Sequence, residues 1–140
     1  MAIDLETTGL DPKHDKIIEI GAVLVIDGEI KETFSTFVNP RRELDGRIRE
    51  LTGITGEMTA GAPDIGDVIG RVVEFCRDLP LLGHHIIFDY SFLRRPRVNK
   101  GLVFETSGID TLTLCRRFMP AEEKKNLENG RRGHKRRSAR

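Results

Sequence analysis

Two acidic residues near the start of the chain are the first that could do chemistry. Asp4 and Glu6 are separated by one residue in the stretch 3–12, IDLETTGLDP. Side chains two apart on a β-strand share a face, and two carboxylates on one face repel each other unless a cation lies between them. Mg²⁺ and Mn²⁺ are hard cations that prefer such oxygen ligands. A single Asp-x-Glu pair is also typical of solvated acids at a strand end, so the pair alone leaves both interpretations open.

The composition is that of a globular chain of about one domain. The 140 residues are 38% hydrophobic and 32% charged, which favours a folded over a disordered chain. Trp is absent and there is one Tyr, so we expect an aliphatic core with some Phe. No apolar run approaches the roughly 18 residues of a membrane-spanning helix. The first residues also lack the basic-then-apolar layout of a signal peptide, so we expect a cytoplasmic protein with no membrane partner.

The charge is distributed unevenly along the chain. Six basic residues against Glu128 give residues 126–140 a net charge of +5, which leaves −4 on the rest of a chain whose net charge is +1. A basic end can contact nucleic acid, or it can be a solvated, disordered tail. We predict one folded domain over 1–125 and a basic, disordered tail over 126–140. Cys76 and Cys115 lack metal-ligand spacing and are expected in the core.

The remaining pattern predicts an α/β fold with a mixed sheet. Strands are expected over 2–5, 16–26, 29–38, 81–83 and 106–109, and helices over 43–51, 63–78, 88–95 and 111–119. Asp27-Gly28 is a hairpin signal between the second and third strands. Three antiparallel strands are therefore followed by βαβ units, with helices on both faces of the sheet.

Several helix boundaries depend on single residues. Pro63 is expected at the first position of its helix, and Pro96 is expected to stop or kink the helix that contains it. Asp110 is expected to cap the helix that follows it. Gly53 is placed to end the helix at 43–51. The apolar side of that helix is expected to contain Leu44, Ile48 and Leu51. The apolar stripe of the helix at 63–78 contains Ile65, Val68, Ile69, Val72, Phe75 and Cys76.

The acidic stretch is the first part of a longer pattern. It is followed in order by IIEIGAV at 17–23, FVNP at 37–40, LTGIT at 51–55, APDIGDVI at 62–69, GHHIIFDYSFL at 83–93 and DTLTLCRRFMP at 110–120. These segments resemble those of DnaQ-like 3′-to-5′ exonucleases of the DEDD superfamily (DEDDh type), a group that includes proofreading domains of bacterial DNA polymerase III. The resemblance covers about residues 2–127 and implies a ribonuclease-H-like fold.

The resemblance implies a catalytic site of three carboxylates. Asp4, Glu6 and Asp89 would be catalytic residues and ligands of two divalent ions, Mg²⁺ or Mn²⁺. In such a site one ion lowers the pKa of the attacking water and the other stabilises the leaving oxygen. Asp89 is distant in sequence, so pairing of the first and fourth strands would have to bring it next to Asp4.

Further residues of the pattern imply contacts with substrate. Thr7, Thr8, Gly9 and Leu10 would line the pocket for the 3′-terminal nucleotide, with Leu10 packed on a base. His84 matches a His that precedes the family's second motif and would contact substrate, although a His near a strand end is more often structural than catalytic. Two aromatic residues beside Asp89, Phe88 and Phe92, are expected to anchor their helix in the core. Asp110 is expected to be a helix cap and not a ligand.

The family's third motif is the part that this sequence lacks. That motif has a general-base His followed five residues later by an Asp, on a C-terminal helix. No acid follows Glu128, His134 is the only late His, and position 139 is Ala. The general base is therefore unknown, with His134 as the sole candidate, and the C-terminal helix is expected to be absent. Because only three residues precede Asp4, the domain is expected to be truncated at both ends relative to the family.

Three functions remain open at this point. The first is a metal-dependent 3′-to-5′ exonuclease acting on single-stranded DNA or RNA 3′ ends, with a DNA polymerase subunit as a partner for proofreading. The second is a nucleic-acid-binding module with impaired catalysis, and the third is a truncated remnant of such an exonuclease. A general base contributes roughly 10²-fold to 10⁴-fold to rate, so we expect weak or absent activity from this chain alone.

Overall fold

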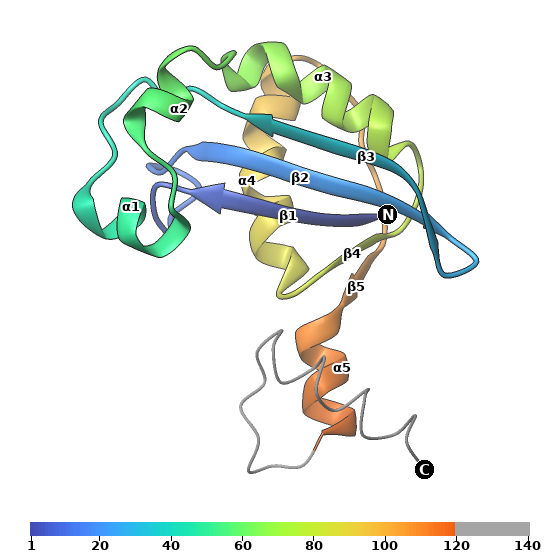
Figure 1. The fold of residues 1–140 in the computed structure, drawn as a ribbon. Helices are drawn as coiled ribbons and strands as arrows, with labels where there is room; N and C mark the ends of the chain where they lie inside the picture. Colours follow the sequence, from blue (N-terminus) through green and yellow to red (C-terminus); the bar gives the residue numbers. More distant parts are fainter. Residues whose placement is uncertain (120–140) are drawn as a thin grey trace.

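The computed structural model describes residues 1–119, which form a five-stranded mixed sheet with helices packed on it (Figure 1). The strand order is β3-β2-β1-β4-β5. The strands are β1 (Ala2–Thr7), β2 (Ile17–Ile26), β3 (Glu29–Phe37), β4 (Leu81–Gly83) and β5 (Gly108–Asp110). The first three are antiparallel, β4 is parallel to β1, and β5 is parallel to β4. The predicted mixed α/β sheet is confirmed.

The register of β1 against β2 places the acidic residues of β1 on one face. Asp4 lies opposite Gly21, and Glu6 lies opposite Glu19. The intervening Leu5 is buried on the other face, as the alternation of a strand requires. At the far end of β2, Asp27 and Gly28 both have positive φ, 53° and 79°, which fits the expected two-residue hairpin.

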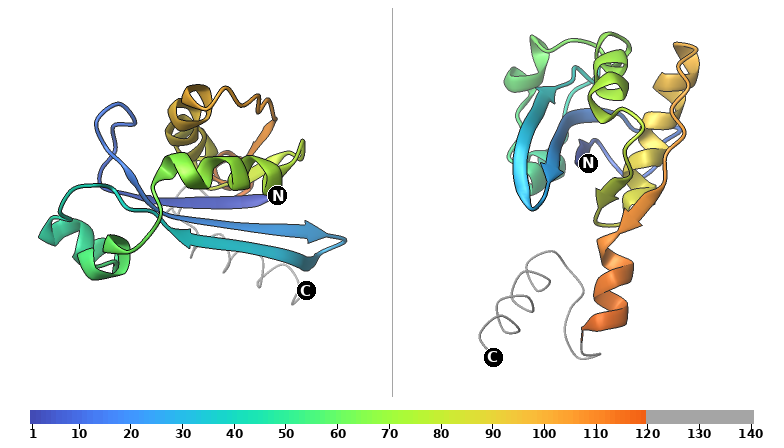
Figure 2. Two further views of the ribbon diagram at one scale, coloured as in Figure 1. Left: turned by 90° about the horizontal axis from the view of Figure 1, so that it is seen from above. Right: turned by 90° about the vertical axis from the view of Figure 1, so that its right-hand side faces the viewer.

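Two long helices cover the core face of the sheet. α3 (Ile65–Cys76) and α4 (Ile86–Asn99) lie together on the same side, as the two views of Figure 2 show. The main core cluster joins them to the sheet through buried side chains that include Ile3, Leu5, Ile20, Val68, Ile69, Val72, Leu93 and Phe104. The predicted stripe of α3 is confirmed. Helices were expected on both faces of the sheet, but α3 and α4 lie on the same face. There they pack against each other as well as against the sheet.

A second, smaller cluster lies under α1 (Gly46–Thr52), at the end of the sheet. It contains Ile18, Leu44, Ile48 and Ile54, with Phe37 packed against it. The prediction that Leu51 belongs to this core is wrong, since its side chain is 77% exposed. The helix begins only at Gly46, so Leu44 precedes it. The helical spacing expected for Leu44, Ile48 and Leu51 therefore does not apply. Gly53 ends the helix at φ 74°, as predicted.

Two predictions about proline are corrected. Pro63 is not the first residue of α3, because its carbonyl accepts a hydrogen bond from the Asn39 N–H at 2.9 Å and the helix begins at Ile65. Pro96 does not stop α4, which continues to Asn99. A proline removes one helical N–H, and the last turn is retained by bonds such as Lys100 N–H to the Pro96 carbonyl at 3.2 Å.

The short helix α2 (Gly56–Ala60) was not predicted, because five residues are too few for a helical period to be recognised. Thr55 caps it, since its hydroxyl accepts a hydrogen bond from the Met58 N–H. β5 is shorter than predicted, as it begins at Gly108, and the Thr106 hydroxyl instead donates to the Leu79 carbonyl.

The last described helix, α5 (Thr111–Phe118), stands apart from the body of the fold (Figure 1). Asp110 caps it as predicted, with its carboxylate accepting from the Leu112 N–H at 2.9 Å. None of its residues is buried, so Cys115 is not the core residue that was expected. Cys76 is buried as expected, and burial raises the pKa of its thiol to about 11. The predictions for the basic tail, His134 and the missing C-terminal helix fall outside the described residues.

None of the helices described in residues 1–119 is long and apolar enough to cross a bilayer.

Candidate active site

Asp89 lies at the centre of the candidate site, although it is far from β1 in the sequence. It is on the first turn of α4, and its side chain is only 3% exposed. Its Oδ1 accepts a hydrogen bond from the backbone N–H of Leu5 at 3.0 Å. This bond joins α4 to the middle of β1, between the two acidic residues of that strand. The sequence-based expectation that Asp89 comes next to Asp4 is therefore met by direct contact with the neighbouring residue.

The three carboxylates interact electrostatically. Burial, followed by the charges of Asp4 and Glu6, raises the pKa of Asp89 to about 7. Desolvation raises the pKa of Asp4, while the Leu5 N–H and the charge of His84 lower it. Desolvation, the charge of Asp4 and the charge of Glu19 raise the pKa of Glu6. The site thus concentrates negative charge that is unfavourable without a cation.

The donor chemistry of these residues fits a hard divalent cation, because every group offered is a carboxylate oxygen. The raised pKa of Asp89 is a second sign of fit, since a cation would remove the cause of that rise. As the side chains stand in residues 1–119, no three or more His, Cys, Asp or Glu residues converge closely enough to hold a metal ion. Asp4 is exposed and Glu6 is partly exposed, so these two side chains have room to change rotamer.

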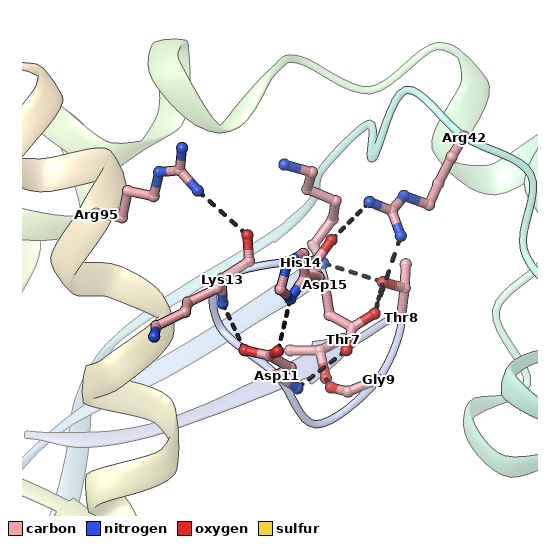
Figure 3. Close-up of polar contacts among 10 residues, drawn as sticks. Thr7, Thr8, Gly9, Asp11, Lys13, His14, Asp15, Arg42 and Arg95 are labelled. Carbon is pink, nitrogen blue, oxygen red and sulfur yellow. Dashed lines mark hydrogen bonds and ion pairs between the residues drawn. The ribbon is translucent and has the colours of Figure 1, made fainter.

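The loop that follows β1 contains the predicted substrate contacts (Figure 3). Thr7 is buried at the end of β1, and its hydroxyl donates to the Gly9 carbonyl at 2.6 Å. The Thr8 N–H donates to the Lys16 carbonyl at 2.8 Å, so this amide is used inside the loop and is not available to a phosphate. Leu10 is 83% exposed, which leaves its side chain accessible to a base.

His84 lies between β4 and α4 and faces both the acidic site and α5. Its Nδ1 is 3.1 Å from the Thr111 hydroxyl, and its charge lowers the pKa of Asp4. The contact with Thr111 fits a structural role for His84, and its position near Asp4 fits a contact with substrate. Phe92 is buried in the core and Phe88 packs against that core, with ring centroids 4.9 Å apart, so both anchor α4 as expected.

A cavity of about 280 Å³ lies beside the same loop. It is bounded by the loop, the start of α3 and the second half of α4, with Lys16, Phe92, Arg95 and Lys100 among its walls. None of the three carboxylates lines it. The candidate active site is therefore separate from this cavity.

Two acidic residues near the site were missed from the sequence. Glu19 lies opposite Glu6 on β2, and its single charge in an otherwise apolar strand was the available signal. Asp15 lies inside the loop after β1, where it interacts with Thr8, Asp11 and Arg42. No local pattern separates Asp15 from an ordinary solvated loop acid.

A mixed sheet of this order, with carboxylates from its central strand and from the helix after the fourth strand, defines an α/β protein of the ribonuclease-H-like nuclease class. The comparison with family models agrees, as the exonuclease family RNase_T matches residues 1–136. The chain belongs to this exonuclease family.

Curated relatives include DNA polymerase III proteins. The chain is 40% identical over 127 residues to a DNA polymerase III PolC-type of Clostridium perfringens, covering 91% of this chain and 9% of that protein. It is 36% identical over 129 residues to a DNA polymerase III subunit epsilon of Aquifex aeolicus, covering 91% of this chain and 64% of that protein. The chain thus spans about a tenth of the PolC-type relatives and somewhat under two thirds of the epsilon subunit.

Solved structures of exonucleases share the fold. Exonuclease X in complex with 5′-overhanging duplex DNA is 32% identical, with a TM-score of 0.66 over 87% of this chain and 65% of that chain. A product-bound exonuclease I is 17% identical, with a TM-score of 0.73 over 88% of this chain and 33% of that chain, which shows likeness of fold alone.

Proposed function

We propose that this chain is a divalent-metal-dependent 3′-to-5′ exonuclease domain that releases nucleotides from single-stranded DNA ends. The observation that carries the proposal is the buried Asp89 carboxylate beside β1, with its pKa raised to about 7 by burial and by the charges of Asp4 and Glu6. Such a concentration of oxygen ligands suits Mg²⁺ or Mn²⁺, and perturbed acids of this kind gather at catalytic sites. Membership of the exonuclease family supports the same reaction.

Each residue has a role in this proposal. Asp4, Glu6 and Asp89 would hold the ion or ions, which when bound supply an activated water and stabilise the charge on the leaving oxygen. The bond from the Leu5 N–H fixes one oxygen of Asp89, so the carboxylate is oriented before any ligand arrives. Thr7, Thr8, Gly9 and Leu10 would contact the terminal nucleotide, with the exposed Leu10 packing on its base. His84 would lie at the edge of the substrate, and the general base remains unassigned.

The DNA polymerase III names of the relatives support two further proposals. The domain would act together with a polymerase subunit in proofreading, and it would work in the cytoplasm, where a bacterial chromosome is replicated. A nucleic-acid-binding module with impaired catalysis is the second candidate, favoured by the net charge of +5 on residues 126–140.

The first test is release of mononucleotides from a 3′-labelled single-stranded oligodeoxynucleotide with Mn²⁺ or with EDTA. We expect release that requires Mn²⁺ and is roughly 10²-fold to 10⁴-fold slower than that of a relative with an intact third motif, because a general base contributes about that much. Asp4→Ala should abolish it. Asp78→Ala is the matched control, since Asp78 is an exposed acid two residues beyond the end of α3.

The outcomes separate the candidate functions. Release that persists in EDTA or in the Asp4→Ala variant would contradict the carboxylate site. Binding to the oligonucleotide without release, weakened steeply by salt, would favour the binding module. Aggregation of the purified chain would favour the truncated remnant, in which apolar surface is left uncovered.

A further inference from the structure

The carboxylate of Asp15 lies at the centre of the loop that follows β1 (Figure 3). Its Oδ2 accepts a hydrogen bond from the Asp11 N–H at 2.9 Å, and its Oδ1 accepts one from the Thr8 hydroxyl at 3.2 Å. The same Oδ1 is 3.9 Å from Nη1 of Arg42. One side chain therefore ties together the beginning and the middle of the loop.

Gly9 fits against this carboxylate because it has no side chain. A Cβ at position 9 would lie 2.4 Å from Oδ2 and 2.6 Å from Cγ of Asp15. Contacts that short would force the Asp15 side chain to move, so only glycine at position 9 leaves this carboxylate where it stands. The glycine of the first motif is thus explained by Asp15, six residues later in the chain.

Two arginines fix the same loop from outside. Arg42 donates from Nη2 to the His14 carbonyl at 2.6 Å, and Arg95 on α4 donates from Nη1 to the Lys13 carbonyl at 3.2 Å. The base of the loop is closed by the Lys16 N–H, which donates to the Thr8 hydroxyl at 3.0 Å. The loop is consequently held by hydrogen bonds from several elements, with the Asp15 carboxylate, which also borders the cavity, at its centre.

Leu10 is the residue that this arrangement presents. It is 83% exposed and lies between Gly9, which packs on Asp15, and Asp11, whose N–H is bound by Asp15. A segment whose backbone is held in its binding conformation before the ligand arrives loses less conformational entropy on binding. The apolar side chain of Leu10 can therefore contribute more to affinity in this loop than in a disordered one.

We propose that Asp15 is a positioning residue that holds the Thr8–Asp11 segment, and with it Leu10, in the conformation that binds the 3′-terminal nucleotide. The inference rests on the proposed function of the domain. It adds a residue that contacts neither the ion nor the nucleotide and acts through Thr8, Gly9 and Leu10.

The test measures affinity and loop order without catalysis. Affinity is measured for a short 5′-fluorescein-labelled oligodeoxythymidine with a free 3′-hydroxyl, in EDTA at low salt, for the wild type, Asp15→Ala, Leu10→Ala and the double variant. We expect Asp15→Ala to weaken binding about tenfold, because two hydrogen bonds to a charged group are lost. In the Asp15→Ala background, Leu10→Ala should have little further effect, since an unfixed Leu10 no longer contributes.

Hydrogen exchange of residues 8–16 provides the second measurement. The amides of Asp11 and Lys16 should lose protection in Asp15→Ala, while the amides of α3 should not. Asp78→Ala, which also replaces an acid by alanine, should leave both affinity and protection unchanged.

Three results would overturn the inference, and they differ from one another. Unchanged affinity in Asp15→Ala, or effects of the Asp15 and Leu10 substitutions that simply add, would remove the role of Asp15 while leaving the proposed function intact. Lost protection throughout the sheet would make Asp15 a general stability residue. Failure of the wild-type chain to bind the oligonucleotide both in EDTA and with Mn²⁺ present would reject the proposed function and the substrate role of Asp15 together.

Discussion

Asp89→Asn should make the metal-free chain more stable near neutral pH while abolishing its response to divalent ions. The pKa of Asp89 is raised to about 7 in the folded chain, whereas an unfolded Asp titrates near about 4. Between these values the folded state binds more protons, so the free energy of unfolding falls as the pH rises. The loss reaches up to about 4 kcal/mol at about pH 8 and is absent below about pH 4. Asparagine carries no charge and avoids this loss.

The prediction is checked by urea unfolding in EDTA at about pH 4, 6 and 8. The unfolding curves of the wild type and of Asp89→Asn should coincide at the lowest pH and diverge as the pH rises, with the variant more stable. Added Mn²⁺ should stabilise the wild type at about pH 8 and leave Asp89→Asn unaffected, because ligand binding stabilises only the state that binds it. If Asp89→Asn is equally stable or less stable than the wild type at about pH 8, the ionised Asp89 carboxylate does not destabilise the folded state and the prediction is wrong.

Leu93→Ala should destabilise the fold by about 2–5 kcal/mol, because it removes a buried side chain and leaves a cavity. Leu93 is 1% exposed and lies one helical turn after Asp89 on α4, so its packing fixes the helix that carries the acid. We expect a lower urea midpoint with an unchanged slope. In the release assay, the remaining folded protein should also respond less to Mn²⁺.

Leu51→Ala is the matched control, since it makes the same chemical change on α1 at a residue that is 77% exposed. Its effect should lie within about 0.5 kcal/mol of zero. Comparable losses from both substitutions would mean that burial in the structure does not govern the stability of this chain.

The order of elements could be read from the sequence because its signals are local. The apolar run of β2, the Asp27-Gly28 turn and the stripe of α3 each fix one element independently of the rest. The errors arose where a local signal meets a tertiary contact. Pro63 is excluded from α3 by its bond to Asn39, and α4 passes through Pro96 because its last turn has other hydrogen bonds.

The residues of the candidate site also fall into those that local sequence patterns predict and those that depend on tertiary contacts. Asp4 and Glu6 could be placed on one face from the alternation of a strand, and Asp89 was inferred from a resemblance. The bond between Asp89 and the Leu5 N–H joins residues 84 positions apart, so no pattern within the sequence announces it. Asp15 and Glu19 were missed because their neighbours come from other segments, such as Arg42 and β1.

The hydrogen bond from Leu5 to Asp89 also gives position 89 two separate duties. β4 has only three residues and pairs with β1 at Ala2, so further along β1 a side-chain oxygen substitutes for the missing strand. Either aspartate or asparagine can fill that structural place, whereas only aspartate brings the charge that attracts an ion. Relatives that no longer hydrolyse nucleic acid should therefore accept many residue types at the exposed position 4. At position 89 they should accept only aspartate or asparagine. A change at position 4 would then mark the loss of activity, whereas a change at position 89 to any residue other than asparagine would mark the loss of the structural hydrogen bond.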